Sequence, residues 1–215
     1  MLVLALDTSS AAVSAGLSRV TPTAVEPVAE SVAVDGRRHG ELLAVGVRVV
    51  LAEAGVDRRE LTAVVVGTGP GPFTGLRVGL VTAATTADAL GIPAYGVCSL
   101  DAFGLADGWV LADARRKEVY WARYAAGERV EGPGVCAPAD LPLPCGAVLA
   151  GAGALLHRAS LPGLVRDEPR YPSAHLLVVR AADRVRAGAP SEPLTPLYLR
   201  RPDAVEPGAS KRVTA

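Results

Sequence analysis

A glycine- and proline-rich loop lies between a β-branched segment at residues 62–66 and a helical segment that begins at about Thr74. The loop has the sequence Gly-Thr-Gly-Pro-Gly-Pro over residues 67–72. Backbone N–H groups of such a loop can bind an anion at the N-terminus of the following helix. Pro70 and Pro72 each remove one N–H donor and stiffen the chain, so the composition favours a fixed docking shape over a phosphate cradle.

The common signatures of enzyme active sites are absent from this sequence. A GxxxxGK[ST] phosphate loop is excluded, because neither Lys117 nor Lys211 follows a glycine. The histidines, His39, His157 and His175, do not have the HxxxH or HExxH spacing that binds a metal on a helix. We therefore predict no catalytic residue and no metal site, and we interpret each histidine as a surface or capping residue.

Composition and cysteine usage restrict the class of protein. Cys98, Cys136 and Cys145 are widely spaced and form no CxxC pair, which fits a reducing cytoplasm. Lys plus Arg and Asp plus Glu balance at 22 each, so the whole chain lacks the positive field that nucleic-acid binding requires. The apolar run at residues 1–6 ends too early for a signal peptide, and no later stretch is long enough for a membrane span. We expect a cytoplasmic protein that meets RNA only through a partner.

The order of expected elements predicts an α/β protein of two similar lobes. We place the lobes at residues 1–103 and 104–215, with a frayed tail from about residue 202. A loop is expected over the Pro-rich residues 132–144, and Ser99 is expected to cap a short helix. The predicted strands are 2–6, 13–18, 28–34, 62–66, 93–97, 109–112, 118–124 and 147–150, and the predicted helices are 41–54, 74–90 and 174–187.

The first two long helices carry more apolar side chains, or more small residues, than a single buried face needs. Helix 41–54 has leucines and valines on more than one side of its axis. Helix 74–90 has glycine or alanine at four-residue spacing, and Gly79 in its interior costs about 1 kcal/mol relative to alanine. These features predict a helix-to-helix interface with another subunit, although a helix enclosed within its own domain gives the same periodicity. Arg77, in the first turn of helix 74–90, either meets an anion or a partner carboxylate or is an ordinary surface arginine.

Five sequence strings together resemble the TsaB (YeaZ) family. The most specific is GTGPGPFTGLRVG at residues 67–79, preceded by LTAVVV, because the family pattern is G-x-GPGSFTG followed by a hydrophobic residue and Arg. The others are LALDTSSAAVSAGL at 4–17, GIPAYGVCSLDA at 91–102, DARRKEVYWARY at 113–124 and PLYLRRPDA at 196–204. The similarity is densest over residues 1–124 and weak over 130–195.

The resemblance implies an actin-like, sugar-kinase-like (ASKHA) fold with two ribonuclease H-like lobes. Asp7, Thr8 and Ser9 then occupy the place of the first phosphate loop, as a vestige. The implied function is that of a non-catalytic scaffold, required with the transferase TsaD and the ATPase TsaE for threonylcarbamoyl transfer to the adenosine next to the anticodon of tRNA. The resemblance also implies homodimers, pairing with TsaD through the first-lobe helices, indirect contact with tRNA and no cofactor on the isolated chain. ATP or ADP would lie at the junction with TsaD.

Packing and resemblance together predict which residues contact a partner or a second copy. The predicted interface residues are Leu43, Val47, Val50, Gly69, Pro70, Gly71, Phe73, Thr74, Gly75, Arg77, Gly79, Ala83 and Ala87.

Two alternatives to the scaffold hypothesis remain open at this stage. One is a small ASKHA-type phosphotransferase that uses Asp7 as its magnesium-side carboxylate. The other is a peptidase, for which Cys98 or His39 would have to act. The catalytic paralogue TsaD uses a histidine pair for a metal, but in this chain position 43 is leucine, so His39 has no second ligand.

Overall fold

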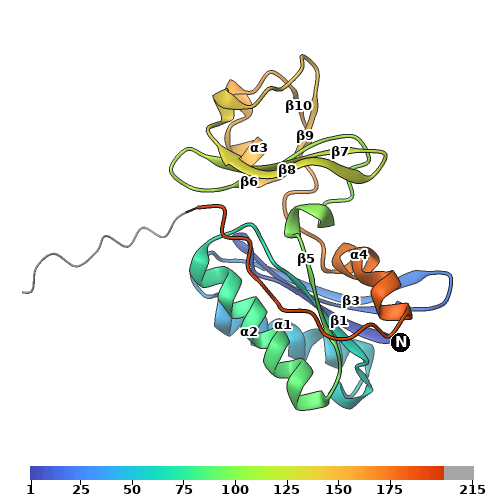
Figure 1. Cartoon of the computed structure of the whole chain (residues 1–215). Coiled ribbons are helices and arrows are strands. Elements are labelled where there is room, and N and C mark those ends of the chain that lie inside the picture. The colour runs from blue at the N-terminus through green and yellow to red at the C-terminus, as the bar shows by residue number, and fades with distance from the viewer. Residues whose placement is uncertain (201–215) are drawn as a thin grey trace, which may run out of the picture.

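The computed structural model describes residues 1–200, which form two lobes, each built on a five-stranded sheet (Figure 1). In the first lobe the strand order is β3-β2-β1-β4-β5. The first three strands are an antiparallel meander, and β4 and β5 run parallel to β1. The strands of this sheet are β1 (Leu2–Asp7), β2 (Ala12–Val20), β3 (Val25–Val34), β4 (Ala63–Gly67) and β5 (Ala94–Val97).

Two long helices cover one face of the first sheet. They are α1 (His39–Ala54) and α2 (Phe73–Leu90), and each ends at a glycine in the left-handed region, with φ of +64° at Gly55 and +65° at Gly91. Leucines and valines of β1 and β4 pack against both helices to form one hydrophobic core. The sequence predicted both helices and both end points.

The opposite face of the first sheet is covered by α4 (Ala174–Arg186), which the sequence placed in the second lobe. Ser173 caps this helix by accepting a hydrogen bond from the Leu176 N–H, as predicted. Buried residues of α4 pack against β1, β4 and β5 in a second core. The predicted lobe 104–215 is therefore wrong as one unit, because the chain returns to the first lobe at Ser173.

The second lobe has its own sheet, in the order β10-β9-β6-β7-β8. The predicted loop at 132–144 is wrong in its first part, because β8 continues to Cys136 and pairs with β7. Pro133 is tolerated there because β8 is an edge strand, where a missing N–H donor breaks no central ladder. The elements of this lobe are β6 (Gly108–Asp113), β7 (Val119–Ala125), β8 (Glu128–Cys136), β9 (Val148–Ala150), α3 (Ala152–Leu156) and β10 (Leu164–Val165). The 3-10 helices within residues 1–200 are η1 (Arg58–Glu60), η2 (Ser99–Ala102), η3 (Pro138–Asp140) and η4 (Arg158–Ser160).

The last described segment, residues 189–200, is an extended strap without regular secondary structure, drawn in red in Figure 1. It follows the first lobe, where the Glu192 N–H donates to the Ala94 carbonyl at 3.1 Å and the Leu197 N–H donates to the Thr68 carbonyl at 2.8 Å. It then reaches the second lobe, where the Arg200 guanidinium donates to the Ala114 carbonyl at 2.8 Å. This C-terminal strap therefore connects both lobes. The predicted frayed tail from about residue 202 lies outside the described residues.

Candidate functional site

The signature loop, residues 67–72, is fixed by hydrogen bonds to the end of β5. The Thr68 N–H donates to the Val97 carbonyl at 2.7 Å, and the Ser99 N–H donates to the Gly69 carbonyl at 2.8 Å. Gly69 has φ of +94°, and a Cβ there would lie 2.9 Å from a Leu76 methyl carbon. Hydrogen bonds to the end of β5 and close packing on Leu76 therefore hold the loop in this position.

The Asp7 carboxylate is enclosed beneath this loop and is 1% exposed. Its Oδ1 accepts hydrogen bonds from the Ser9 N–H at 2.9 Å and the Ser9 hydroxyl at 2.7 Å. Its Oδ2 accepts from the Ser99 hydroxyl at 2.6 Å. The prediction that Ser99 caps the following 3-10 helix is therefore wrong. Its hydroxyl donates to Asp7 and accepts a hydrogen bond from the Gly69 N–H instead.

The buried carboxylate predicts a particular dependence of stability on pH. Burial raises the pKa of Asp7 above 3.8, and the hydrogen bonds from Ser99 and Ser9 only partly oppose this shift. The Asp7 carboxyl therefore binds a proton more tightly in the folded chain than in the unfolded chain. Consequently the contribution of Asp7 to the free energy of unfolding falls as pH rises from 3.8 through the native pKa. Asp7→Asn, which stays neutral, is expected to remove this fall. Urea unfolding of both proteins at a series of pH values measures it, and parallel curves would contradict the assignment.

Thr8 packs against two glycines of α2, and Ser9 packs against Gly71 of the signature loop. The Thr8 hydroxyl donates to the Gly75 carbonyl at 2.7 Å and accepts from the Gly79 N–H at 3.1 Å. A Cβ at Gly79 would lie 2.5 Å from Thr8 Oγ1, and a Cβ at Gly71 would lie 2.3 Å from the Ser9 carbonyl oxygen. Gly71, Gly75 and Gly79 therefore leave room for the chain's own β1–β2 turn, not for a helix of another subunit, and Ala83 and Ala87 are buried in the core of the first lobe.

Nine of the thirteen predicted interface residues are consequently corrected, because they are buried within this one chain and cannot form a docking surface. They are Leu43, Val50, Gly69, Pro70, Gly71, Gly75, Gly79, Ala83 and Ala87. Phe73, Thr74 and Arg77 are exposed, and Val47 is half-buried. Two exposed valines were missed as interface candidates, Val45 on α1 and Val81 on α2, with exposed fractions of 45% and 59%. Both valines lie on the solvent-facing side of their helix, as Phe73 does on α2.

The contact between Gly79 and Thr8 can be tested by a single methyl group. Gly79→Ala is expected to lower the free energy of unfolding by about 1–3 kcal/mol, because the new Cβ displaces the Thr8 hydroxyl and overpacks the turn. That loss exceeds the gain of about 1 kcal/mol in helix propensity. Chemical denaturation measures the effect. A variant more stable than the wild type would show that the turn adjusts freely.

Arg77 is held by aromatic rings at the start of α2. Its guanidinium carbon lies 3.9 Å from the centroid of the Phe73 ring, which stacks on Tyr198 of the strap with centroids 4.8 Å apart. The Arg77 Nε–H also donates to the Tyr198 hydroxyl at 3.3 Å. The cation at the positive end of the helix is thus stabilised by π faces. This cluster joins the C-terminal strap to the first turn of α2.

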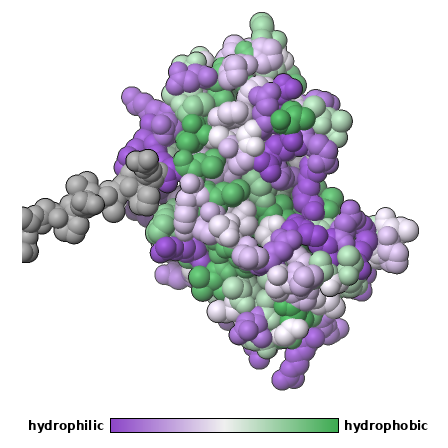
Figure 2. Space-filling model, viewed as in Figure 1, coloured by the Kyte–Doolittle hydropathy of each residue, from purple (hydrophilic) through white to green (hydrophobic). Residues whose placement is uncertain are grey.

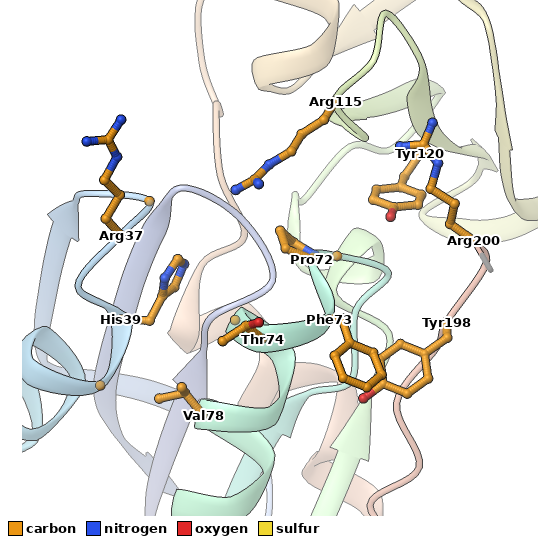
Figure 3. Close-up of a pocket in the computed structure, with 14 residues that line it drawn as sticks. Arg37, His39, Pro72, Phe73, Thr74, Val78, Arg115, Tyr120, Tyr198 and Arg200 are labelled. Carbon is orange, nitrogen blue, oxygen red and sulfur yellow. The ribbon is translucent and has the colours of Figure 1, made fainter. Parts of the chain in front are cut away.

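A cleft of about 600 Å³ lies between the lobes, beside the signature loop. Figure 3 shows Arg115 reaching over Pro72, with Arg37 and His39 on one side and Tyr120 and Arg200 on the other. His39, predicted as a surface or capping residue, is 8% exposed, and its Nε2–H donates to the Ser10 carbonyl at 2.9 Å. Within residues 1–200 no group of three or more His, Cys, Asp or Glu side chains could hold a metal ion.

The geometry weakens both enzymatic alternatives. The phosphotransferase hypothesis needs Asp7 to reach magnesium, but its carboxylate is enclosed and already accepts three hydrogen bonds. The peptidase hypothesis needs Cys98 or His39 to act, but burial raises the pKa of the Cys98 thiol to about 12, and the His39 Nε2–H donates to the Ser10 carbonyl. No helix in the described part of the chain is long and apolar enough to cross a membrane.

The two lobes, each built on a five-stranded sheet with helices, define the class of protein as a two-lobed α/β fold. Component A of (R)-2-hydroxyglutaryl-CoA dehydratase from Acidaminococcus fermentans matches with a TM-score of 0.53 and 10% identity, over 86% of this chain and 99% of that one, which supports the fold alone. YeaZ from Pseudomonas aeruginosa matches with a TM-score of 0.73 and 28% identity, over 92% of this chain and 99% of that one.

Sequence comparison gives the family. The family model of TsaD, tRNA N6-adenosine threonylcarbamoyltransferase, matches residues 30–152. The uncharacterized protein Rv3421c of Mycobacterium tuberculosis is 51% identical over 207 residues, which cover 94% of this chain and 93% of that protein. The chain spans 56% of the length of ML0378 of Mycobacterium leprae, at 50% identity over 94% of this chain. The tRNA threonylcarbamoyladenosine biosynthesis protein TsaB of Bacillus subtilis is 32% identical over 58% of this chain and 55% of its own length. The chain belongs to the TsaB (YeaZ) family.

Proposed function

We propose that this chain is a non-catalytic scaffold and activator subunit in the attachment of threonylcarbamoyl to tRNA. It acts with a TsaD-type transferase and a TsaE-type ATPase on the adenosine next to the anticodon. The pathway is supported by the name of the Bacillus subtilis relative, a tRNA threonylcarbamoyladenosine biosynthesis protein. The scaffold role is supported by the outward face of α1 and α2, which presents apolar side chains to solvent.

The outer helix face consists of the exposed residues of the two helices. Val45 is 45% exposed, Phe73 is 41% exposed and Val81 is 59% exposed. A groove of about 570 Å³ runs between the C-terminal halves of the helices, with Val47 and Leu51 on the α1 side. Figure 2 shows hydrophobic patches over the part of the first lobe where α2 lies in Figure 1. Val45, Phe73 and Val81 do not line this groove, and Val81 instead lines a separate cavity of about 460 Å³ on α2. Exposed apolar side chains on a helix face are typical of a protein-binding surface.

The corrected interface keeps the predicted helices, omits the nine buried residues and adds Val45 and Val81. TsaD binds the outer helix face, and a second copy of this chain binds the same face as a homodimer when TsaD is missing. The tRNA reaches the complex through TsaD, and ATP or ADP binds at the junction with TsaD. The complex works in the cytoplasm.

Reconstituted threonylcarbamoyl transfer tests the proposal. Purified TsaD and TsaE are expected to modify tRNA when this chain is present. Without it, the rate of threonylcarbamoyl transfer is expected to fall to background. Asp7→Asn and Cys98→Ala are expected to keep the rate within about twofold once stability is matched, because neither side chain touches a substrate in a scaffold. Transfer by TsaD and TsaE at the full rate in the absence of this chain would refute the role.

A further inference from the structure

The segment that leads from the first lobe to the second is attached to the second lobe by Asp101. This link, η2, follows β5 and precedes β6. Oδ1 of Asp101 accepts hydrogen bonds from the Tyr124 hydroxyl at 2.7 Å and from the Arg129 Nε–H at 2.8 Å. Tyr124 lies on β7 and Arg129 on β8, so the link is bonded to the sheet of the second lobe.

Arg180 of α4 connects the first lobe to this link and to the second lobe. Its Nε–H donates to the Asp101 carbonyl at 3.1 Å, and one terminal nitrogen donates to the Gly127 carbonyl. The other terminal nitrogen donates to the Glu128 carboxylate at 3.0 Å. Helix α4 packs on the first sheet and against η2 (Figure 1), whereas Gly127 and Glu128 belong to the second lobe. A single guanidinium therefore contacts both lobes and the link.

The β7–β8 turn holds the Gly127 carbonyl in a fixed place on the second lobe. Ala126 and Gly127 have φ of +51° and +79°, and the left-handed region is costly for Ala126 because it carries a Cβ. The Ala126 N–H donates to the Asp107 carboxylate at 3.1 Å, and the Gly127 N–H donates to the Ala106 carbonyl at 2.8 Å. The turn is thus secured from its own lobe, and its carbonyl is a firm point of attachment for Arg180.

The contacts of Arg180 differ in how far water weakens them. The Glu128 side chain is 79% exposed, so its ion pair with Arg180 is screened and contributes little. The bonds to the Asp101 and Gly127 carbonyls are partly buried, and their donor is charged, which makes them the stronger contacts. A planar guanidinium presents several N–H groups at fixed angles, so arginine reaches these separate acceptors at once and lysine does not.

The C-terminal strap attaches the second lobe at a different point. There Arg200 donates to the Ala114 carbonyl at 2.8 Å. Ala114 lies in the turn before β7, and Gly127 lies in the turn after it. One attachment would act as a pivot together with the link, but attachments at both ends of the same strand prevent rotation about either. The Arg180 contacts and the strap together therefore fix the angle between the lobes.

A polar cavity of about 310 Å³ lies beside Arg180 and contains a natural probe of this contact. Cys98, at the end of β5, lines the cavity together with Asp101, Arg129 and Arg180. Its side chain is 9% exposed, and burial raises the pKa of its thiol to about 12. Thiol reagents need both access and a thiolate, so Cys98 reacts slowly while the lobes stay in contact here.

We propose that Arg180 is a latch that fixes the angle between the two lobes, so that the chain presents both lobes as one rigid body. When its bonds to the Asp101 and Gly127 carbonyls break, the β7–β8 end of the second lobe swings away from α4 about the link. The strap holds the other end of β7 during this motion. The latch uses no residue of the outer helix face, so it does not depend on the scaffold role.

Pulsed electron paramagnetic resonance measures the angle between the lobes. Nitroxides on Val32→Cys of β3 and Leu164→Cys of β10 report an interlobe distance, since these residues are 54% and 64% exposed. The exposed and half-buried cysteines are removed by Cys136→Ser/Cys145→Ser. Arg180→Gln is expected to broaden the distance distribution about twofold or more, because the second lobe can then tilt about the link.

Arg186→Gln is the matched control on the same helix. The Arg186 side chain is 28% exposed, close to the 27% of Arg180, and it too donates to a carbonyl and a carboxylate. Its acceptors, Thr21 at 2.9 Å and Asp183 at 3.0 Å, both lie in the first lobe, so the distribution is expected to stay as narrow as in the wild type. Glu128→Gln, which removes only the exposed ion pair, is also expected to keep this width.

Alkylation of Cys98, followed by mass spectrometry of the full chain, gives an independent reading. It is expected to be about tenfold faster in Arg180→Gln and within about twofold of the wild-type rate in Arg186→Gln. If the rate rises only as far as the free energy of unfolding in urea falls, Cys98 reacts from the unfolded chain and the latch is overturned.

An unchanged distance distribution in Arg180→Gln would also overturn the latch, whatever the alkylation rate. Equal broadening in Arg186→Gln would do the same, because it would reveal a general loosening of α4. Should Arg180→Gln fail to fold, Arg180→Lys keeps the charge and the apolar stem, and it is expected to broaden the distribution because its ammonium does not reach both carbonyls. Transfer activity with TsaD is measured separately, so failure of the latch leaves the scaffold proposal standing.

Discussion

A chain carrying Gly67→Ala is expected to lose much of the stability of its first lobe. Gly67 ends β4, and a Cβ at this position would lie 1.8 Å from Asp7 Oδ2 and 2.4 Å from Ser99 Oγ. Both atoms are buried and joined by a hydrogen bond, so the methyl group breaks the bond that Oδ2 accepts from the Ser99 hydroxyl. We expect the free energy of unfolding to fall by about 3 kcal/mol or more. That loss is a large fraction of the stability of a typical domain, which is about 5–15 kcal/mol.

Urea denaturation measures this loss, and Gly40→Ala provides a matched control. Gly40 lies in α1, and no heavy atom lies within 4 Å of the position that its Cβ would occupy. The control is expected to be neutral or stabilised by up to about 1 kcal/mol, because alanine has the higher helix propensity. If the Gly67 variant unfolds at the same urea concentration as the control, the enclosed carboxylate network does not determine the stability of this lobe.

The double variant Val45→Asp/Val81→Asp is expected to abolish the complex with TsaD while leaving the monomer folded. Both valines are exposed, one on each helix of the outer helix face, so aspartate costs little in the free chain. In the complex each carboxylate would be removed from water without a partner, and we expect the dissociation constant to rise about 100-fold or more. Size-exclusion chromatography and calorimetry with purified TsaD measure the change.

The control for this variant lies on the second lobe. Val130→Asp/Leu164→Asp replaces two apolar residues that are 48% and 64% exposed and adds the same charge. It is expected to bind TsaD like the wild type. Should both double variants bind equally well, the outer helix face is not the docking surface and the interface must be sought elsewhere on the chain.

The sequence predicted the helices of the first lobe well, because their signals are local. Gly55 and Gly91 follow the last apolar turns, and both adopt the left-handed conformation that ends a helix. The segment that packs against the glycines of α2 was predicted wrongly. Four-residue spacing shows that a helix face lacks bulky side chains, but it does not show which segment contacts that face. The neighbour is Thr8, 71 residues from Gly79 along the chain.

Long-range pairings explain the other differences. The return of α4 to the first sheet depends on contacts across more than 140 residues, such as the hydrogen bond from the Ala174 N–H to Glu30. Pro133 suggested a loop, since a central strand excludes proline, but an edge strand does not. The cleft arginines were not predicted as a group, because Arg37, Arg115 and Arg200 come from segments that only the folded chain brings together.

The covering of the first sheet by α4 has a consequence for how the chain folds during synthesis. The ribosome makes β1 first, yet the helix that shields one side of this strand comes about 170 residues later. A nascent chain that ends before Ser173 therefore exposes buried residues such as Val3, Ala5 and Tyr95 to the solvent of the cell. Folding from the N-terminus, which is common in multidomain proteins, cannot complete this lobe. The first part of the polypeptide to leave the ribosome is among the last to reach its final packing.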